Sequence, residues 1–90
     1  MNRVQVLADL GNRILLARRR LGLTQEDLAE RADISVTFCG QIERGGRNPT
    51  FLVVHRIASA LGTTVSELCQ GISLEPPSQN PASRATRRNS

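Results

Sequence analysis

The hydrophobic and polar positions of this chain repeat at helical spacing, and no stretch alternates as a strand would. The clearest apolar stripe has the i, i+4, i+7, i+11 spacing of one helix face and consists of Leu10, Ile14, Ala17 and Leu21. Gly22 follows at once, and glycine is the usual residue just past a helix end. We therefore predict a first helix that begins at about Val4 or Asp9 and ends at Leu21.

Four further helices are predicted from residues whose side-chain oxygen can cap a helix N-terminus: Thr24, Ser35, Thr50 and Thr64. The first three caps open predicted helices over residues 25–32, 36–44 and 51–61. The capping box TVSE at residues 64–67 opens a short fifth helix. Only residues 33–35 separate the second and third helices, and a link of this length is typical of a helix-turn-helix.

The composition of the chain changes after Ile72. Residues 73–90 hold three of the four prolines and four serines, but only three apolar residues. Such a segment cannot bury enough apolar surface to offset its chain entropy. We therefore predict one folded domain over residues 1–72 and a disordered tail over residues 73–90.

The chain carries twelve basic and eight acidic residues, a net charge of +4, and every basic residue is arginine. This bias fits nucleic-acid binding, and it equally fits a base-composition bias of the coding DNA. No apolar run has the length of a membrane span, and no basic segment leads into a long apolar one at the start. We expect a cytoplasmic, nucleoid-associated protein in which Cys39 and Cys69 stay reduced and act as small apolar residues.

The predicted third helix has two unlike sides. One side holds Cys39, Ile42 and Glu43, and the opposite, outer stripe holds Thr37, Gly40, Gln41 and Arg44. The outer stripe contains no acid and no large apolar group, and all its side chains except that of the glycine can hydrogen-bond a base edge or a phosphate. A recognition helix in the major groove needs such a stripe. A merely solvated face would show the same pattern.

Several runs together resemble the Cro and repressor-type helix-turn-helix domains of phages, often called the XRE family. They are LTQEDLAERA (residues 23–32), IERG (42–45), RNPT (47–50), IASALG (57–62) and SEL (66–68). The run GQIERG (40–45), with Arg47 and Asn48, also resembles the small controller proteins of restriction–modification systems. The resemblance implies a compact, all-α, five-helix domain of the lambda-repressor type that binds operator DNA, usually as a dimer.

The resemblance, carried over residue by residue, implies base contacts for Val36, Thr37 and Gln41. The implied phosphate contacts come from Thr24, Gln25, Ser35, Arg44, Arg47 and Asn48. Gln41 has both the donor and the acceptor needed to pair with adenine through its amide. Gln25 stands at a helix N-terminus, where free backbone N–H groups favour an anion.

The family also joins two positions across the first and third helices, here Arg18 and Glu43. We expect them to form a structural clamp that presents the third helix, and two independent surface charges are the alternative. The resemblance further places a subunit contact on the last two helices, formed by Leu52, Val53, Leu68 and Ile72.

Four other positions need an interpretation of their own. Asp33 stands at a turn where the family commonly has glycine, and aspartate tolerates the left-handed conformation better than most residues. Gly40, inside a helix, allows either a closer approach to DNA or tight packing. We expect Phe38 to be half-buried rather than to touch a thymine methyl group, and His55 to be partly buried. No partner lies at metal-ligand spacing from His55, so we expect no metal and no cofactor.

The sequence therefore predicts a sequence-specific transcriptional regulator that acts as a homodimer on a palindromic operator. Its expected partners are double-stranded DNA and a second copy of itself, with no membrane contact and no apparent small-molecule effector. One alternative is a DNA-binding antitoxin whose tail folds onto a toxin, and another is an interaction adaptor that kept the fold without base recognition. We expect that the protein is not an enzyme, because the sequence shows no nucleophile–base pair, carboxylate pair or phosphate-binding glycine loop.

Overall fold

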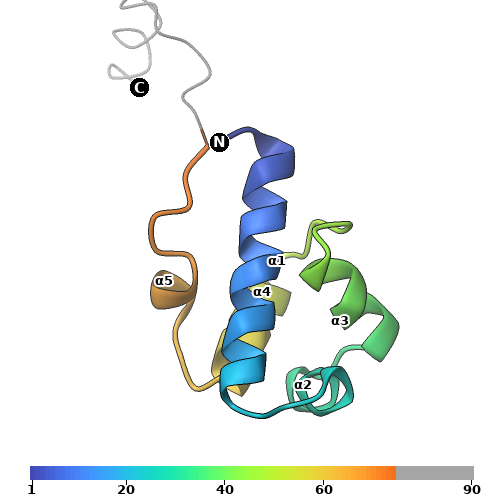
Figure 1. Cartoon of the computed structure of the whole chain (residues 1–90). Coiled ribbons are helices and arrows are strands. Elements are labelled where there is room, and N and C mark those ends of the chain that lie inside the picture. Colours follow the sequence, from blue (N-terminus) through green and yellow to red (C-terminus); the bar gives the residue numbers. More distant parts are fainter. Residues whose placement is uncertain (75–90) are drawn as a thin grey trace, which may run out of the picture.

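The computed structural model describes residues 1–74, which form five α-helices and no strand within that range (Figure 1). The helices are α1 (Arg3–Arg20), α2 (Gln25–Ala32), α3 (Val36–Glu43), α4 (Phe51–Ala60) and α5 (Val65–Leu68). The all-α, five-helix prediction is therefore confirmed. Residues 75–90, which make up most of the predicted tail, lie outside the described residues, so the domain boundary at residue 72 stays a prediction.

Side-chain caps start all five helices. The residue before each helix accepts a hydrogen bond from the backbone N–H three positions later, and these caps are Asn2, Thr24, Ser35, Thr50 and Thr64. Four of them were predicted, whereas Asn2 was not, and its reciprocal capping box with Gln5 explains why α1 begins at Arg3. The capping box predicted at residues 64–67 is only half formed, because the Glu67 carboxylate lies near the Thr64 hydroxyl rather than its backbone N–H.

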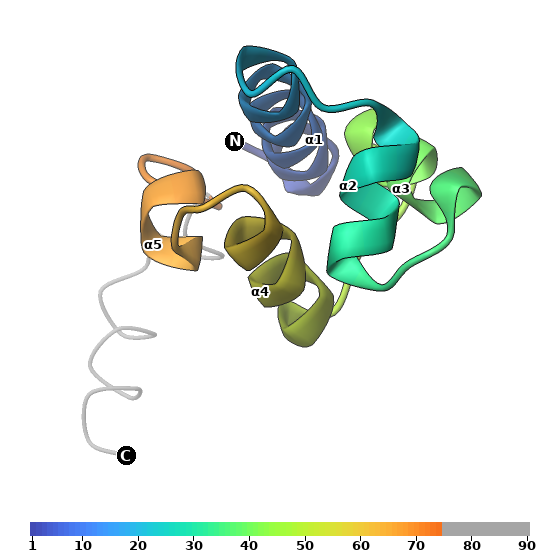
Figure 2. The same cartoon turned by 90° about the horizontal axis from the view of Figure 1, so that it is seen from below.

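Helix α1 stands between two groups of helices. Figures 1 and 2 show α2 and α3 on one side of α1 and α5 on the other, while α4 packs against both α2 and α5. The largest fully buried side chains come from four different helices and are Ile14, Leu28, Cys39, Ile42 and Ile57. A single core therefore holds α3 against α1 and α2.

The buried face of α1 differs from the predicted stripe at its end. Leu21 is 53% exposed, whereas Arg18 is buried. The helix ends at Arg20 with Leu21 as its C-cap, and the buried face continues through Arg18 instead. The buried face of α1 thus includes a charged side chain, that of Arg18, which the spacing of the apolar residues did not predict.

The link between α2 and α3 turns sharply at Asp33. This residue adopts the left-handed conformation with φ 58° and ψ 49°, as the sequence predicts. Its N–H donates to the carbonyl of Glu30, and the N–H of Ile34 donates to that of Ala29. These bonds close the end of α2, so that α3 starts three residues later.

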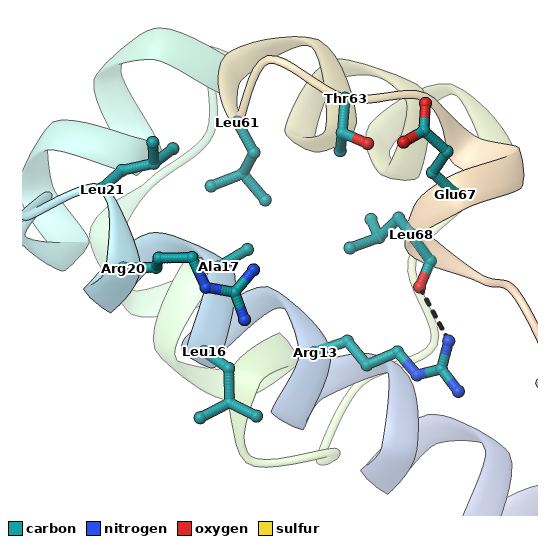
Figure 3. Close-up of a pocket in the computed structure, with 9 residues that line it drawn as sticks. All are labelled: Arg13, Leu16, Ala17, Arg20, Leu21, Leu61, Thr63, Glu67 and Leu68. Atoms are coloured by element: carbon teal, nitrogen blue, oxygen red, sulfur yellow. Dashed lines mark hydrogen bonds between the residues drawn. The ribbon is translucent and has the colours of Figure 1, made fainter.

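Helix α5 is anchored to α1 beside a groove of about 370 Å³ that lies between α1 and the α4–α5 connection (Figure 3). Arg13 donates to the backbone carbonyl of Leu68, as Figure 3 shows, and also to that of Gln70. The Leu68 side chain lines the groove but is only 6% exposed, because it packs into the core. The side chain of Leu68 is therefore used inside the domain, and the subunit contact expected to include it stays a prediction.

Candidate nucleic-acid interface

The outer side of α3 is exposed to solvent at both ends, whereas neighbouring side chains cover its middle. Val36, Thr37 and Arg44 are exposed and Gln41 is half-buried, but Gly40 is buried. A methyl group on Gly40 would lie 3.2 Å from Nη1 of Arg44 and 3.5 Å from Oε1 of Gln25. Of the two roles considered for Gly40, the structure supports tight packing, because these side chains close over it.

Arg18 and Glu43 form a buried ion pair between α1 and α3. Nε of Arg18 donates to Oε2 of Glu43 at 2.7 Å, and Nη2 donates to Oε1 at 3.0 Å. Nη1 of Arg18 donates to the backbone carbonyl of Leu23 at 2.9 Å. The hydrogen bonds to Glu43 raise the pKa of Arg18, against the opposing effect of burial. The two residues are therefore paired, as the resemblance implied, and are not independent surface charges.

Gln25 extends this pair to α2. Its Nε2 donates to Oε1 of Glu43 at 2.9 Å, so the Glu43 carboxylate accepts hydrogen bonds from side chains of both α1 and α2. Among the described residues, no buried side-chain nitrogen or oxygen lacks a partner. One carboxylate thus fixes the relative positions of α1, α2 and α3, and the other N–H of the Gln25 amide has no partner within residues 1–74.

The segment after α3 folds back over its outer side. The backbone N–H of Gly46 donates to the carbonyl of Gln41 at 2.8 Å, and Nη1 of Arg47 donates to Oε1 of Gln41 at 3.1 Å. The Arg47 guanidinium lies over the ring of Phe38, 5.2 Å from its centroid. Phe38 is half-buried, as predicted, but no pattern in the sequence indicates that Phe38, Gln41 and Arg47 form one cluster.

Two of the predicted phosphate contacts act as helix caps. The side-chain oxygen of Thr24 accepts from the N–H of Asp27, and that of Ser35 accepts from the N–H of Phe38. The Asp27 carboxylate accepts from the N–H of Thr24, and mainly this backbone hydrogen bond lowers the pKa of Asp27. Asn48 is exposed beyond α3. Of the nine predicted DNA-contacting residues, Gln25 is the first residue of α2, and the other eight lie on α3, just before α2 or α3, or just after α3.

Two of the large exposed apolar side chains lie next to each other at the start of α4, and none of the described ones lies on α5. Leu52 is 56% exposed and Phe51, which was not predicted, is 73% exposed, whereas Val53 and Ile72 pack against the core. His55 is exposed and stacks on Phe51 with ring centroids 6.5 Å apart. The expectation of a partly buried histidine is therefore wrong, because this side of α4 faces solvent beside the end of α2.

Within residues 1–74, no group of three or more His, Cys, Asp or Glu side chains is placed to hold a metal ion. No helix in the same range combines the length and the apolar character that crossing a membrane requires.

Comparisons with known proteins agree with this geometry. The profile of a helix-turn-helix family matches residues 14–68. An uncharacterized HTH-type transcriptional regulator, y4dJ of Sinorhizobium fredii, is 39% identical over 59 residues, which are 66% of this chain and 77% of that protein. The immunity repressor protein of Bacillus phage phi105 is also 39% identical over 59 residues, which are 66% of this chain but only 41% of that repressor.

The fold is also found in a solved structure. The crystal structure of the restriction-modification controller protein C.AhdI from Aeromonas hydrophila matches with a TM-score of 0.68 and 34% sequence identity. The match covers 69% of this chain and 94% of that one.

Proposed function

This chain belongs to the helix-turn-helix family of DNA-binding transcriptional regulators, which is not a family of enzymes, and from that premise we propose that it acts as a homodimer on a two-fold symmetric operator. The DNA-binding part of this proposal rests on one observation: the Glu43 carboxylate accepts hydrogen bonds from Arg18 of α1 and from Gln25 of α2. It fixes α2 and α3 as one rigid unit, and a rigid α3 can place its side chains against base edges in the major groove.

Some of the proposed contacts would specify the base sequence, and the others would position the protein on the DNA. Val36 and Thr37 are exposed on α3 and Gln41 is half-buried one turn further on, and all three would face base edges. Arg44, Arg47 and Asn48 follow along the chain and would meet the sugar–phosphate backbone, with the caps Thr24 and Ser35 at the other end. The free N–H of Gln25 would reach a phosphate while its other N–H stays on Glu43.

The proposed subunit contact lies at the start of α4. A single recognition helix covers only a few base pairs, so discrimination requires two copies of the domain. Phe51 and Leu52 are neighbouring, large and more than half exposed, which is unfavourable in water unless another surface covers them. A second copy of the chain, related by a two-fold axis, would bury both.

Selection of bound DNA from a random library tests the function directly. We expect a two-fold symmetric motif whose half-sites are about one helical turn, roughly 10 base pairs, apart. Leu52→Glu should leave the domain folded but weaken binding to the selected site, whereas Glu30→Gln, a change on an exposed position of α2, should not. Enrichment of no sequence would favour an interaction adaptor and refute the proposal, and unchanged binding by Leu52→Glu would refute the proposed contact.

A further inference from the structure

The groove between α1 and the α4–α5 connection carries opposite charges on its two walls. Arg20 extends over it from α1, and Glu67 stands on the opposite wall, on α5 (Figure 3). Both residues are exposed, and within residues 1–74 neither has an ion-pair partner. The other charged residue of the groove, Arg13, is already engaged by Asp9 and by two backbone carbonyls. Arg20 and Glu67 are therefore the two charges of this groove that are free to pair with another molecule.

Large apolar side chains surround the same groove. Leu16 and Leu21 line it from α1 and are 49% and 53% exposed, and Ala17 and Leu61 add to its apolar lining. Exposed apolar side chains that gather at one place mark an interaction surface, whereas single scattered ones do not. Covering them removes apolar area from water, which is the main favourable term in most protein–protein association. The groove thus offers an apolar area together with a fixed pattern of charge.

A second copy of the same groove matches this pattern. A two-fold axis brings a surface patch against itself, so that every contact between two residues occurs twice. Such a patch is self-complementary when it carries one charge of each sign on opposite sides, as Arg20 and Glu67 are placed here. Arg20 of each copy then meets Glu67 of the other. A small acid would satisfy Arg20 and leave Glu67 unpaired, and a small base would do the reverse.

We propose that this groove is a contact between two copies of the chain, in which Arg20 and Glu67 pair across a two-fold axis. The surface is separate from the contact proposed at the start of α4, because neither Phe51 nor Leu52 lines the groove. It is also separate from α3, which lies on the other side of α1 (Figures 1 and 2), so a single operator-bound dimer does not need it. A chain with two different two-fold contacts assembles beyond the dimer, into a closed tetramer or an open row of copies.

Charge reversal in a Leu52→Glu background tests the groove by itself, because Leu52→Glu disrupts the contact proposed at the start of α4. Sedimentation equilibrium measures the mass of each variant at up to millimolar concentration, and far-UV circular dichroism shows that the variant is folded. The Leu52→Glu chain should form dimers. Adding either Arg20→Glu or Glu67→Arg places like charges against each other twice and should weaken dimerisation by about tenfold or more.

Mixing the two charge-reversed chains is the sharpest measurement. Each of them repels a copy of itself, but in an equimolar mixture every pair again joins opposite charges. Dimers with one copy of each chain should therefore form as readily as those of the Leu52→Glu chain. A role of Arg20 or Glu67 within one chain would give no such rescue.

Two further variants in the same background separate the pairing from general effects of charge and of apolar area. Arg19→Glu makes the same charge change on an exposed neighbour that does not line the groove, and it should leave dimerisation unchanged. Leu16→Gln removes exposed apolar area without a change of charge, and it should weaken dimerisation.

The results decide this proposal without deciding the proposed function. A monomeric Leu52→Glu chain, dimerisation that ignores both charge reversals, or a mixture that stays monomeric would overturn the groove contact. An equal loss of dimers in Arg19→Glu would overturn the pairing of Arg20 with Glu67. DNA recognition is tested separately, by the selection from a random library.

Discussion

Gly11 of α1 lies so close to the backbone of Glu43 that a methyl group on residue 11 would come within 2.6 Å of the Glu43 carbonyl oxygen. The carbonyl oxygen of Ile42 is another close neighbour of the same position. Helix α1 therefore supports the last turn of α3 through direct contact with its backbone. This contact leaves no room for any side chain at residue 11.

We predict that Gly11→Ala destabilises the domain by about 1–3 kcal/mol, the usual range for inserting a carbon into a packed site. Helix propensity alone predicts the opposite sign, because alanine is more favourable than glycine in a helix interior by about 1 kcal/mol. Denaturant unfolding measures the change. Gly46→Ala is the matched control: its nearest neighbour would be the Gln41 carbonyl at 3.5 Å, so it should be nearly neutral. A Gly11→Ala variant as stable as the wild type would contradict the close contact.

The Arg18–Glu43 pair should show strong coupling in a double-mutant cycle. Removal of either partner leaves a buried charge without its counterpart, which costs about 3–5 kcal/mol. The double alanine variant should therefore be clearly less destabilised than the sum of the two single variants. The Asp9–Arg13 pair is the control, because both side chains are partly exposed and the shortest distance is 3.4 Å. Additive losses for Arg18 and Glu43 would show that the ion pair contributes nothing.

The Cys39 thiol should make stability decline at alkaline pH. Burial, with a contribution from Glu43, raises the pKa of Cys39 from 9.0 to about 11. Between these values the unfolded chain loses the proton and the folded domain keeps it, so the free energy of unfolding falls as pH rises. Cys39→Ala should be less stable at pH 8 because of its cavity, but its stability should fall less between pH 9 and 11. Parallel pH profiles for wild type and variant, from urea unfolding, would refute this account.

Arg44 should contribute to DNA affinity without contributing to base choice. Its exposed side chain lies at the end of α3, where the proposed orientation places a phosphate. Arg44→Ala should weaken binding to all sequences alike and flatten the dependence of log K on log salt by about one unit per subunit. Titrations on the selected operator and on unrelated DNA at several salt concentrations measure both effects, with Arg20→Ala as the control. A changed base preference in Arg44→Ala would mean that α3 lies differently in the groove.

Local signals were sufficient to predict most of the helices. Thr24, Ser35 and Thr50 act on the turn that follows them, so their role is visible in the sequence itself. The same holds for Asp33, whose left-handed conformation depends on its own backbone. The cap at Asn2 was also accessible, because Asn2 and Gln5 have the spacing of a capping box.

Features that depend on where two elements meet were not predictable. A four-residue helix such as α5 has no periodicity that reveals its buried side, so the burial of Leu68 became visible only with α1 beside it. Gly11 looks like an ordinary helix residue until α3 crosses it. The Gln41–Arg47 bond joins a helix to a loop that returns over it, and no sequence spacing indicates that return.

The shared carboxylate of Glu43 has a consequence for how the domain responds to heat. This carboxylate bonds α3 to both α1 and α2, so we expect the three helices to open in one step. Amide hydrogens in α1, α2 and α3 should then exchange with a common free energy of opening. Operator occupancy would stay selective up to the melting transition and vanish within it, rather than pass through a range of temperatures in which a loosened recognition helix binds many sequences.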